Sequence, residues 1–251
     1  MDAIDTIIND TAQFLSGNSI YSEYSKQWQY LFESYVGGDE YQKAGHLNRY
    51  QNESIAEYAA RLRSTPLQNH CNSVISVYNS FLFRQNPTRQ FGSLENLPDL
   101  TDFLNDADMD GRNFNSFMKD VGTYASIFGH AWIILAKPNL GATTRGEEMS
   151  QGVRPYANML SPLVVLDWSW HRSANGRYTL DYFKYIEDIN GEIVTCKEWT
   201  PDFIRTVVAD KEENLIREQY VEPNGLGKIP AILAYNKRSI IRGIGISDIA
   251  D

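Results

Sequence analysis

The hydrophobic pattern of this 251-residue chain changes its period near the middle of the sequence. Up to about residue 130, apolar residues recur at spacings of three, four and seven, which is the period of amphipathic helices. Beyond it, short runs of β-branched and aromatic residues are separated by turn residues, as in strands. This order predicts an α+β fold, with a mainly helical part over residues 1–130 and a mainly β, antiparallel part over residues 131–251.

Two helices are predicted between residues 54 and 87. Ser54-Ile55-Ala56-Glu57 has the spacing of a capping box and opens a helix that runs to about Arg63. Pro66 suits the first turn of the next helix, and Pro87 ends it. An apolar stripe on this second helix predicts either a core face or a subunit contact. It consists of Leu67, Val74, Ile75, Tyr78, Phe81 and Leu82.

A helix and a strand are predicted on the two sides of Gly129. After a shorter helical segment over residues 98–104, a helix begins at about Asn113 and ends at Gly129 as its C′ residue. The apolar run at 131–136 is too short for a free helix and rich in β-formers, so it predicts a buried strand. Its Trp132 and Ile134 are expected in the core, together with Leu166.

Five more strands are predicted from runs of β-branched and aromatic residues, at 163–170, 178–186, 192–199, 203–208 and 215–221. Asn190-Gly191 predicts a hairpin with a type I′ turn, in which both central residues take positive φ. Asn175-Gly176 predicts a second hairpin. Residues 139–154 are polar and lack periodicity, which indicates an exposed loop.

Composition limits the class of protein. The 42% of hydrophobic residues suffices for a core, while no apolar run approaches the ~20 residues that span a bilayer. Met1–Asp5 lacks the basic region of a signal peptide, so a cytoplasm is the expected compartment. Cys71 and Cys196 lie in unlike contexts and are predicted to be free thiols. A net charge of −9 argues against a surface that grips nucleic acid tightly.

The last residues, 245–251, have the pattern of a helix start. Ser247 suits the N-cap position, and Asp248 places an acidic residue in the first turn. So few residues cannot form a helix by themselves, because nucleation fixes several residues before hydrogen bonds compensate. The expectation is that the 251 residues are the front part of a longer chain.

Asp106, Asp108 and Asp110, followed by Gly111, match the first six positions of a calcium-binding loop. The match fails at position twelve, where Phe117 replaces the bidentate glutamate. The three aspartates are therefore a weak candidate metal site, with a calcium-steadied binding module as one hypothesis. In the alternative interpretation, the carboxylates cap the helix that begins after Arg112.

Asp167-Trp168-Ser169-Trp170-His171-Arg172 combines a carboxylate, indoles and a histidine. A carbohydrate-active hydrolase using Asp167, Glu187 or Glu198 is the alternative function that this composition raises. Alternation along a strand argues against it, because Asp167 and Trp168 would face opposite sides of the sheet.

No other pattern in the sequence indicates catalysis. His46, His70 and His130 stand singly and are interpreted as structural histidines. The sequence carries no Walker loop, dinucleotide glycine motif, Gly-x-Ser-x-Gly or His-Glu-x-x-His. The sequence thus predicts no cofactor and no catalytic residue.

Several segments, in their order along the chain, resemble the portal proteins of tailed bacteriophages, which are ring-forming head-to-tail connectors. One of them, over residues 108–138, is a polar-capped helix that ends in glycine and is followed by a buried strand and a proline. The segments that carry the resemblance are 50–63, 66–87, 108–138, 161–168, 226–236 and 245–251.

The resemblance implies the wing portion of a portal subunit, with the stem, clip and crown in a continuation of the chain. It implies a structural protein rather than an enzyme, in a homo-oligomeric and dodecameric ring at the capsid vertex of the virion, assembled in the host cytoplasm. Its implied partners are the terminase motor, head-completion or adaptor proteins, capsid or scaffolding proteins and the double-stranded DNA passing through the channel, with no membrane involved. An acidic balance suits a conduit through which DNA must slide.

Overall fold

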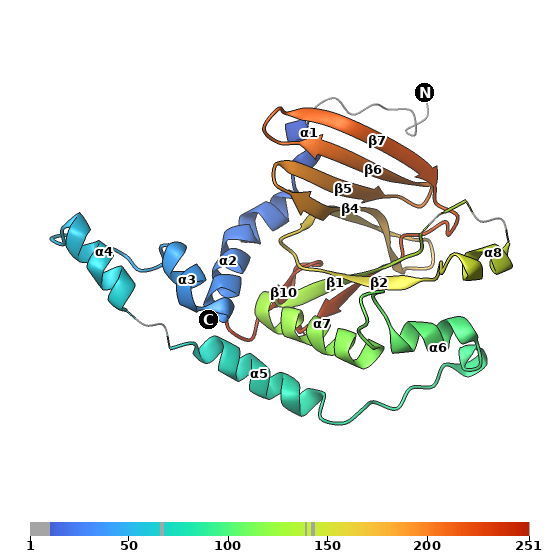
Figure 1. Ribbon diagram of the computed structural model, residues 1–251, viewed down its shortest axis with the longest axis horizontal. Coiled ribbons are helices and arrows are strands. Elements are labelled where there is room, and N and C mark those ends of the chain that lie inside the picture. The colour runs from blue at the N-terminus through green and yellow to red at the C-terminus, as the bar shows by residue number, and fades with distance from the viewer. Residues whose placement is uncertain (1–10, 66–67, 139, 142–143, 251) are drawn as a thin grey trace. The chain divides into compact units, whose positions relative to one another are not determined.

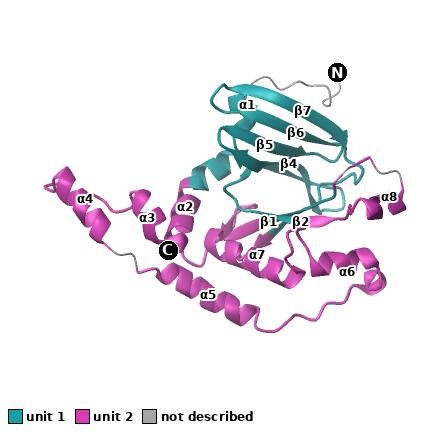
Figure 2. Cartoon of the chain, viewed as in Figure 1, with its two compact units in different colours: residues 1–25, 132–137, 157–233 teal, residues 26–131, 138–156, 234–251 magenta. Residues whose placement is uncertain are grey.

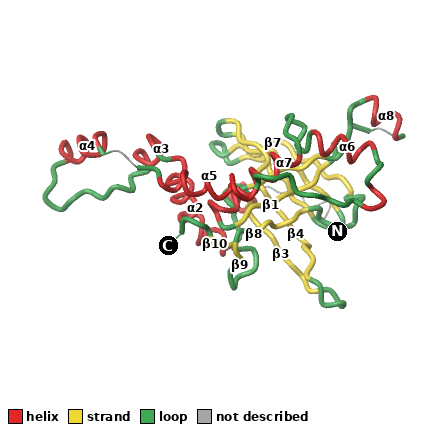
Figure 3. Tube along the Cα trace, turned by 90° about the horizontal axis from the view of Figure 1, so that it is seen from below, coloured by secondary structure: helices red, strands yellow, loops and turns green. Residues whose placement is uncertain are grey.

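The computed structural model describes residues 11–65, 68–138, 140–141 and 144–250 (Figure 1). Its helices are α1 (Thr11–Leu15), α2 (Ser19–Val36), α3 (Gly38–Lys43), α4 (Ile55–Ser64), α5 (His70–Leu82), the 3-10 turn η2 (Gly92–Leu94), α6 (Pro98–Asn105), α7 (Phe114–Phe128) and α8 (Arg145–Ser150). Its strands are β1 (His130–Ala136), β2 (Tyr156–Leu160), β3 (Val165–Arg172), β4 (Tyr178–Asn190), β5 (Ile193–Trp199), β6 (Phe203–Asp210), β7 (Leu215–Pro223), β8 (Ala231–Tyr235), β9 (Lys237–Arg238) and β10 (Gly245–Ile246). Figure 3 shows the helices in red and the strands in yellow. The fold is α+β, as predicted.

The predicted helix signals are confirmed for α4 and α7. Both bonds of the capping box are present at the start of α4, where Ser54 accepts from the N–H of Glu57 and the Glu57 carboxylate accepts from the N–H of Ser54. Asn113 caps α7, and Gly129 ends it in the left-handed region at φ 87°. Glycine suits that position because it has no Cβ to clash there.

Helix α5 differs from the prediction at both ends. It begins at His70, where the side chain of Asn69 accepts from the N–H of Asn72 at 2.9 Å, and it ends at Leu82. Pro66 and Leu67, expected in its first turn, lie outside the described residues. Ile75 is its only buried apolar residue, so the predicted stripe is not a core face as a whole.

Four helices were not predicted individually, namely α1, α2, α3 and α8. Helix α8 lies within residues 139–154, for which the sequence predicts an exposed loop. That prediction is wrong for Arg145–Ser150. The start of α8 is another capping box, in which Thr144 accepts from the N–H of Glu147 at 3.3 Å. This Thr-x-x-Glu spacing was visible in the sequence, but no apolar periodicity followed it.

The five-stranded sheet is an antiparallel meander in the order β3-β4-β5-β6-β7. The hairpin predicted at Asn190-Gly191 is confirmed, but its turn type is wrong. Asn190 pairs with Ile193, so the central residues are Gly191 and Glu192. Gly191 has φ 61°, whereas neither Asn190 nor Glu192 has a positive φ. Glycine at the first central position with an ordinary second residue is the type II′ pattern.

The chain forms two compact units, each assembled from separated segments (Figure 2). One unit takes residues up to 25, 132–137 and 157–233, and the other takes residues 26–131, 138–156 and 234–251. The first holds the five-stranded sheet and most of the three-stranded sheet, whose order is β2-β1-β8. The second holds α3 to α8 and the two-stranded sheet β10-β9. The assignment of residues 1–130 and 131–251 to parts of a portal wing stays a prediction.

Trp132 is the centre of the aromatic core in the first unit. It is fully buried, as is Ile134, which confirms the prediction for both residues. The Trp132 ring lies 4.7 Å from that of Phe183 and 6.0 Å from that of Trp170, and its Nε1–H donates to the Tyr21 hydroxyl at 2.8 Å. Leu166 is only partly buried and packs against another cluster, made of Phe14, Val194, Cys196 and Val207.

The helix predicted to start at Ser247 is absent over residues 247–250. The Ser247 hydroxyl accepts from the N–H of Ile249 at 3.1 Å, as an N-cap would, and donates to the carbonyl of Ser126 at 3.0 Å. Within the described residues, no helix combines the length and the apolar character needed to cross a bilayer.

Candidate functional site

Two of the three aspartates of the calcium-like turn, Asp106 and Asp108, are held by protein donors, whereas Asp110 is exposed. Asp106 accepts from the N–H of Gly111 at 2.9 Å and pairs with Arg154 at 2.5 Å. Asp108 accepts from the backbone N–H groups of Asp110 and Arg112 and forms an ion pair with the Arg112 guanidinium. Partial burial acts to raise the pKa of Asp108, but these hydrogen bonds outweigh it and hold the pKa below its usual value.

The aspartates do not cap α7, in contrast to the alternative interpretation of the sequence. Asn113 provides that cap, since its side chain accepts from the N–H of Ser116 at 3.0 Å. The carboxylates instead order the turn itself, where Met109 and Gly111 take φ of 64° and 86°. No cluster of three or more His, Cys, Asp or Glu side chains able to hold a metal occurs in the described part of the chain.

Calcium is expected to bind the turn with a Kd of about 10⁻⁴ M or weaker. A cation would have to displace Arg112 from Asp108 and Arg154 from Asp106, and Phe117 offers no ligand. Titration calorimetry of the wild type and Asp108→Ala tests this. A tight calcium signal that disappears in Asp108→Ala would show that the turn is a metal site after all.

A surface pocket of about 390 Å³ lies beside this turn. Helix α6 contributes Asp99 and Asp102, and the 149–154 segment contributes Met149, Val153 and Arg154. Arg145 pairs with Asp99 at 3.0 Å, so two arginines already neutralise part of the acidic wall. The pocket is a charged groove between two short helices.

Two of the carboxylates considered for a hydrolase belong to a row of alternating charges across the five-stranded sheet. In the strand register, Asp167 is opposite Lys184, Lys184 is opposite Glu198, and Glu198 is opposite Arg205. Directly opposed residues share one face of a sheet. The row therefore runs acid, base, acid, base across β3, β4, β5 and β6.

The members of this row neutralise one another and hold the N-terminal segment. Arg205 donates to Glu198 at 2.9 Å, and both side chains are buried. The Lys184 ammonium donates to the carbonyl of Phe14 at 2.7 Å, and Asn18 donates to Asp167 at 3.1 Å. Burial lowers the pKa of Lys184, although the carboxylates of Asp167 and Glu198 act to raise it.

Glu187, the third hydrolase candidate, lies apart from the row and pairs with Lys197 at 2.6 Å. Each of the three carboxylates thus has a protein partner, and the row is arranged as a structural network. The expected alternation is confirmed, because Asp167 faces Lys184 while Trp168 is opposite Phe183. His171 is exposed, with its Nδ1 3.6 Å from Asp181.

A close backbone crossing in the second unit joins the end of α7 to β10. A Cβ added to Gly245 would lie 1.9 Å from the carbonyl oxygen of Gly129, and one added to Gly129 would lie 2.3 Å from the Gly245 carbonyl carbon. Asn236 donates its backbone N–H to the Gly129 carbonyl at 2.9 Å, and Asp248 donates to that of Ser126 at 2.9 Å. We call this contact the glycine crossing.

His130 lies beside the glycine crossing. Its Nδ1 accepts from the N–H of Gly245 at 3.2 Å, and its ring meets that of Trp28 edge-on at 5.4 Å. Burial lowers the pKa of His130 to about 3, so the imidazole is neutral at physiological pH. His46 is hydrogen-bonded to Glu33 at 2.5 Å, and His70 is exposed at the start of α5.

Acid is expected to destabilise the protein through His130. Its pKa is about 3 when folded and near 6.5 when unfolded, so between these values the unfolded state binds more protons. The free energy of unfolding keeps this contribution in full above pH 6.5 and decreases by up to about 4 kcal/mol as the pH drops toward 3. His130→Asn keeps an acceptor for the Gly245 N–H and should not show this dependence of the unfolding free energy on pH.

Denaturant unfolding at a series of pH values measures the effect. The same substitution at the exposed His171 is the matched control for replacing a histidine by asparagine away from the buried site. Equal slopes for the wild type and His130→Asn would show that burial does not keep this imidazole neutral.

The outer face of α5 exposes large apolar side chains. Val77, Tyr78, Phe81 and Leu82 are 54, 60, 69 and 73% exposed, and Val74 is exposed as well. The opposite side of the helix faces α7, where Ile75 is buried and Asn79 donates to the Thr123 hydroxyl at 2.7 Å. Helix α5 contains no Asp, Glu, Lys or Arg. We call Val74, Val77, Tyr78, Phe81 and Leu82 the α5 outer face.

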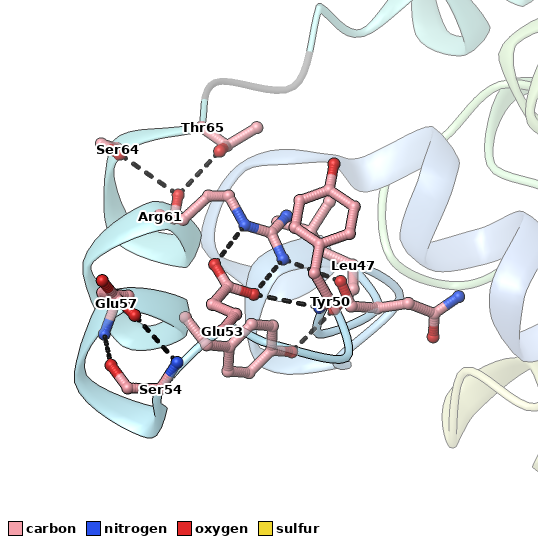
Figure 4. Close-up of polar contacts among 10 residues, drawn as sticks. Leu47, Tyr50, Glu53, Ser54, Glu57, Arg61, Ser64 and Thr65 are labelled. Atoms are coloured by element: carbon pink, nitrogen blue, oxygen red, sulfur yellow. Dashed lines mark hydrogen bonds and ion pairs between the residues drawn. The ribbon is translucent and has the colours of Figure 1, made fainter.

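Residues 44–65, which we call the arm, are organised around one arginine (Figure 4). Arg61 donates to both carboxylate oxygens of Glu53 at 2.7 and 2.8 Å. Its guanidinium lies over the ring of Tyr50 at 4.4 Å and over that of Tyr58 at 5.6 Å. The Tyr58 hydroxyl donates to the carbonyl of Leu47 at 2.7 Å. These bonds fix the shape of the arm.

Comparison with known proteins adds no identification. No protein-family model matches the chain, and no curated protein matches its sequence.

Proposed function

We propose that this chain is a structural subunit of a ring-shaped phage portal at the capsid vertex. The observation that carries the proposal is the helix-to-strand step from Asn113 to Pro138. Asn113 caps α7, Gly129 ends it in the left-handed region, and β1 follows at once with Trp132 fully buried. This step is one of the segments in which the sequence resembles the portal family.

Electrostatics supports a conduit over an enzyme. The chain has 32 acidic against 23 basic residues, so it has no excess of cations to hold phosphates, as suits a ring through which DNA slides. The carboxylates considered for hydrolysis are engaged with Asn18, Lys197 and Arg205. In the proposed role the protein performs no reaction, and a separate terminase supplies the ATP-driven work.

The proposed assembly is a closed homo-oligomer, dodecameric by resemblance, in the portal vertex of the virion. Its proposed partners are terminase, head-completion or adaptor proteins, capsid or scaffolding proteins and the double-stranded DNA in the channel. Each subunit of a ring uses two different surfaces, one toward each neighbour.

The test is the assembly of the natural gene product that contains these residues. Native mass spectrometry and electron microscopy should find closed rings of one subunit number with a central channel, and purified terminase should bind them. A product that stays monomeric at every concentration, or forms only two-fold dimers, contradicts the proposal.

A substrate screen separates the portal role from the hydrolase alternative. Glycoside and ester substrates are tested on the wild type, Asp167→Asn and Glu198→Gln, with folding checked by circular dichroism. A portal subunit gives no turnover in any of the three. Reproducible turnover that either substitution abolishes, typically by several powers of ten, would identify an enzyme.

A further inference from the structure

A long stretch of the second unit contributes nothing to a core. From residue 38 to residue 65, all of which are described, no residue is buried, although α3 and α4 lie there. Isolated helices shorter than about 12 residues are marginal in water, because nucleation is costly. The ion pair between Arg61 and Glu53 orders the arm without burying any of its residues. The arm therefore has a defined shape but little burial to support it.

The α5 outer face exposes apolar surface that the chain itself does not cover. It presents a group of large apolar side chains, and Phe81 and Leu82 are 69 and 73% exposed. Contiguous apolar surface of this kind marks interaction sites. The side of α5 that faces α7 is already occupied through Ile75 and Asn79, so the outer face is the side left for a partner.

Charge indicates which partner can approach. The chain carries a net charge of −9, so two copies repel each other on average. The arm is an exception, because Arg49, Arg61 and Arg63 outnumber Glu53 and Glu57. Arg61 is paired with Glu53, so the arm keeps a net charge of +1. It can approach α5 of another copy without charge repulsion, because α5 contains no Asp, Glu, Lys or Arg.

The apolar residues of the arm match this arrangement. Ile55 is 76% exposed and Tyr50 is 68% exposed, so both can lose apolar surface only against something outside their own segment. Removing apolar surface from water is the main favourable contribution to association, so such side chains can supply most of the contact energy.

We propose that the α5 outer face binds the arm of a second copy of this chain. Ile55 and Tyr50 of the arm pack against Phe81 and Leu82 of the other copy. Because the two surfaces differ, the contact is heterologous, and successive copies add head to tail until the rotation closes a ring. That the second copy is the neighbour in a portal ring rests on the proposed function, whereas the contact itself does not.

Sedimentation of the 251-residue chain tests the contact, at concentrations up to about 1 mM, where even a millimolar Kd gives substantial association. The weight-average mass of the wild type should rise with concentration. Phe81→Ser on the outer face and Ile55→Ser on the arm should each weaken association at least about tenfold. Both residues are exposed, so folding should be kept.

The matched control is Ile240→Ser, at a residue that is 103% exposed and lies in neither surface. It should associate as the wild type does. A wild-type mass that is independent of concentration overturns the contact. So does association that Phe81→Ser leaves unchanged or that Ile240→Ser weakens equally.

Disulfide trapping distinguishes the proposed pairing from other self-contacts. In a Cys71→Ser background, a chain with Ile55→Cys is mixed with a chain with Leu82→Cys under mild oxidation. The mixed dimer should dominate over both homodimers. Dominant Leu82→Cys homodimers would mean that α5 packs on α5, which contradicts an arm-to-α5 contact.

The outcome also separates this inference from the proposed function. Closed rings that persist in Phe81→Ser would overturn the contact and leave the portal proposal standing. Mixed disulfides in a product that forms only open chains would support the contact and contradict the portal proposal.

Discussion

Gly245→Ala is expected to destabilise the protein by about 4 kcal/mol, which is among the largest costs of a single substitution. Its new Cβ would lie 1.9 Å from the carbonyl oxygen of Gly129, a distance that no side-chain movement can relieve because both groups are backbone. The reciprocal change, Gly129→Ala, meets the Gly245 backbone at 2.3 Å and also places alanine at φ 87°. Denaturant unfolding followed by circular dichroism measures both.

Two other glycines provide the matched controls. Gly191 has φ 61° but no atom within 4 Å of an added Cβ, so Gly191→Ala reports the backbone strain alone, about 1–2 kcal/mol. Gly146 lies within α8 with open space around it, and Gly146→Ala should be neutral or slightly stabilising. If Gly245→Ala costs no more than Gly191→Ala, the glycine crossing is not the tight contact described above.

Trp132→Ala is expected to cost about 3–5 kcal/mol. The substitution empties a fully buried site, removes the ring contacts with Trp170 and Phe183 and leaves the Tyr21 hydroxyl without the indole donor at 2.8 Å. The same unfolding measurement applies, and assembly of the natural product should fail in parallel if the proposed role is right.

Two variants separate the parts of this cost. Trp132→Phe keeps most of the packing volume, and Tyr21→Phe removes only the hydroxyl partner, at about 1 kcal/mol. Tyr220→Ala, at a residue 60% exposed, should change stability by less than about 0.5 kcal/mol. A Trp132→Ala cost as small as that of Tyr220→Ala would contradict the placement of Trp132 at the centre of its core.

The sequence predicted best those elements whose signals are local. The capping box at Ser54, the end of α7 at Gly129 and the hairpin after Asn190 each depend on a few consecutive residues, and the structure contains all three. The turn type after Asn190 was wrong because strand register, and not the dipeptide, decides which two residues are central.

The stripe on α5 shows what periodicity leaves undecided. It indicated that Tyr78, Phe81 and Leu82 lie on one side of a helix, but not whether the chain itself covers that side. The side packed on α7 instead includes Asn79, a polar residue that an apolar template does not count. Its burial depends on the Thr123 hydroxyl, which lies far away in sequence.

The site residues depend on still longer-range information. Asp167 and Glu198 looked like candidate acids because a sequence does not reveal that Asn18 and Arg205 would engage them. Likewise, the partner of Asp106 in the calcium-like turn is Arg154, which belongs to the stretch predicted as a loop. Such pairings arise from tertiary contacts.

The alternating charges of Asp167, Lys184, Glu198 and Arg205 also limit how the five-stranded sheet can misalign during folding. Shifting one strand by a single residue turns its side chains to the opposite face. For β4, such a slip would carry the Lys184 ammonium to the side where Phe183 packs against Trp132 and would bring Phe183 among the carboxylates. An unpaired charge among aromatic rings costs several kcal/mol, so the misaligned sheet is strongly disfavoured. The row thus favours the correct register of the strands, and it does so with Asp167 and Glu198, the residues that most resemble catalytic acids in the sequence.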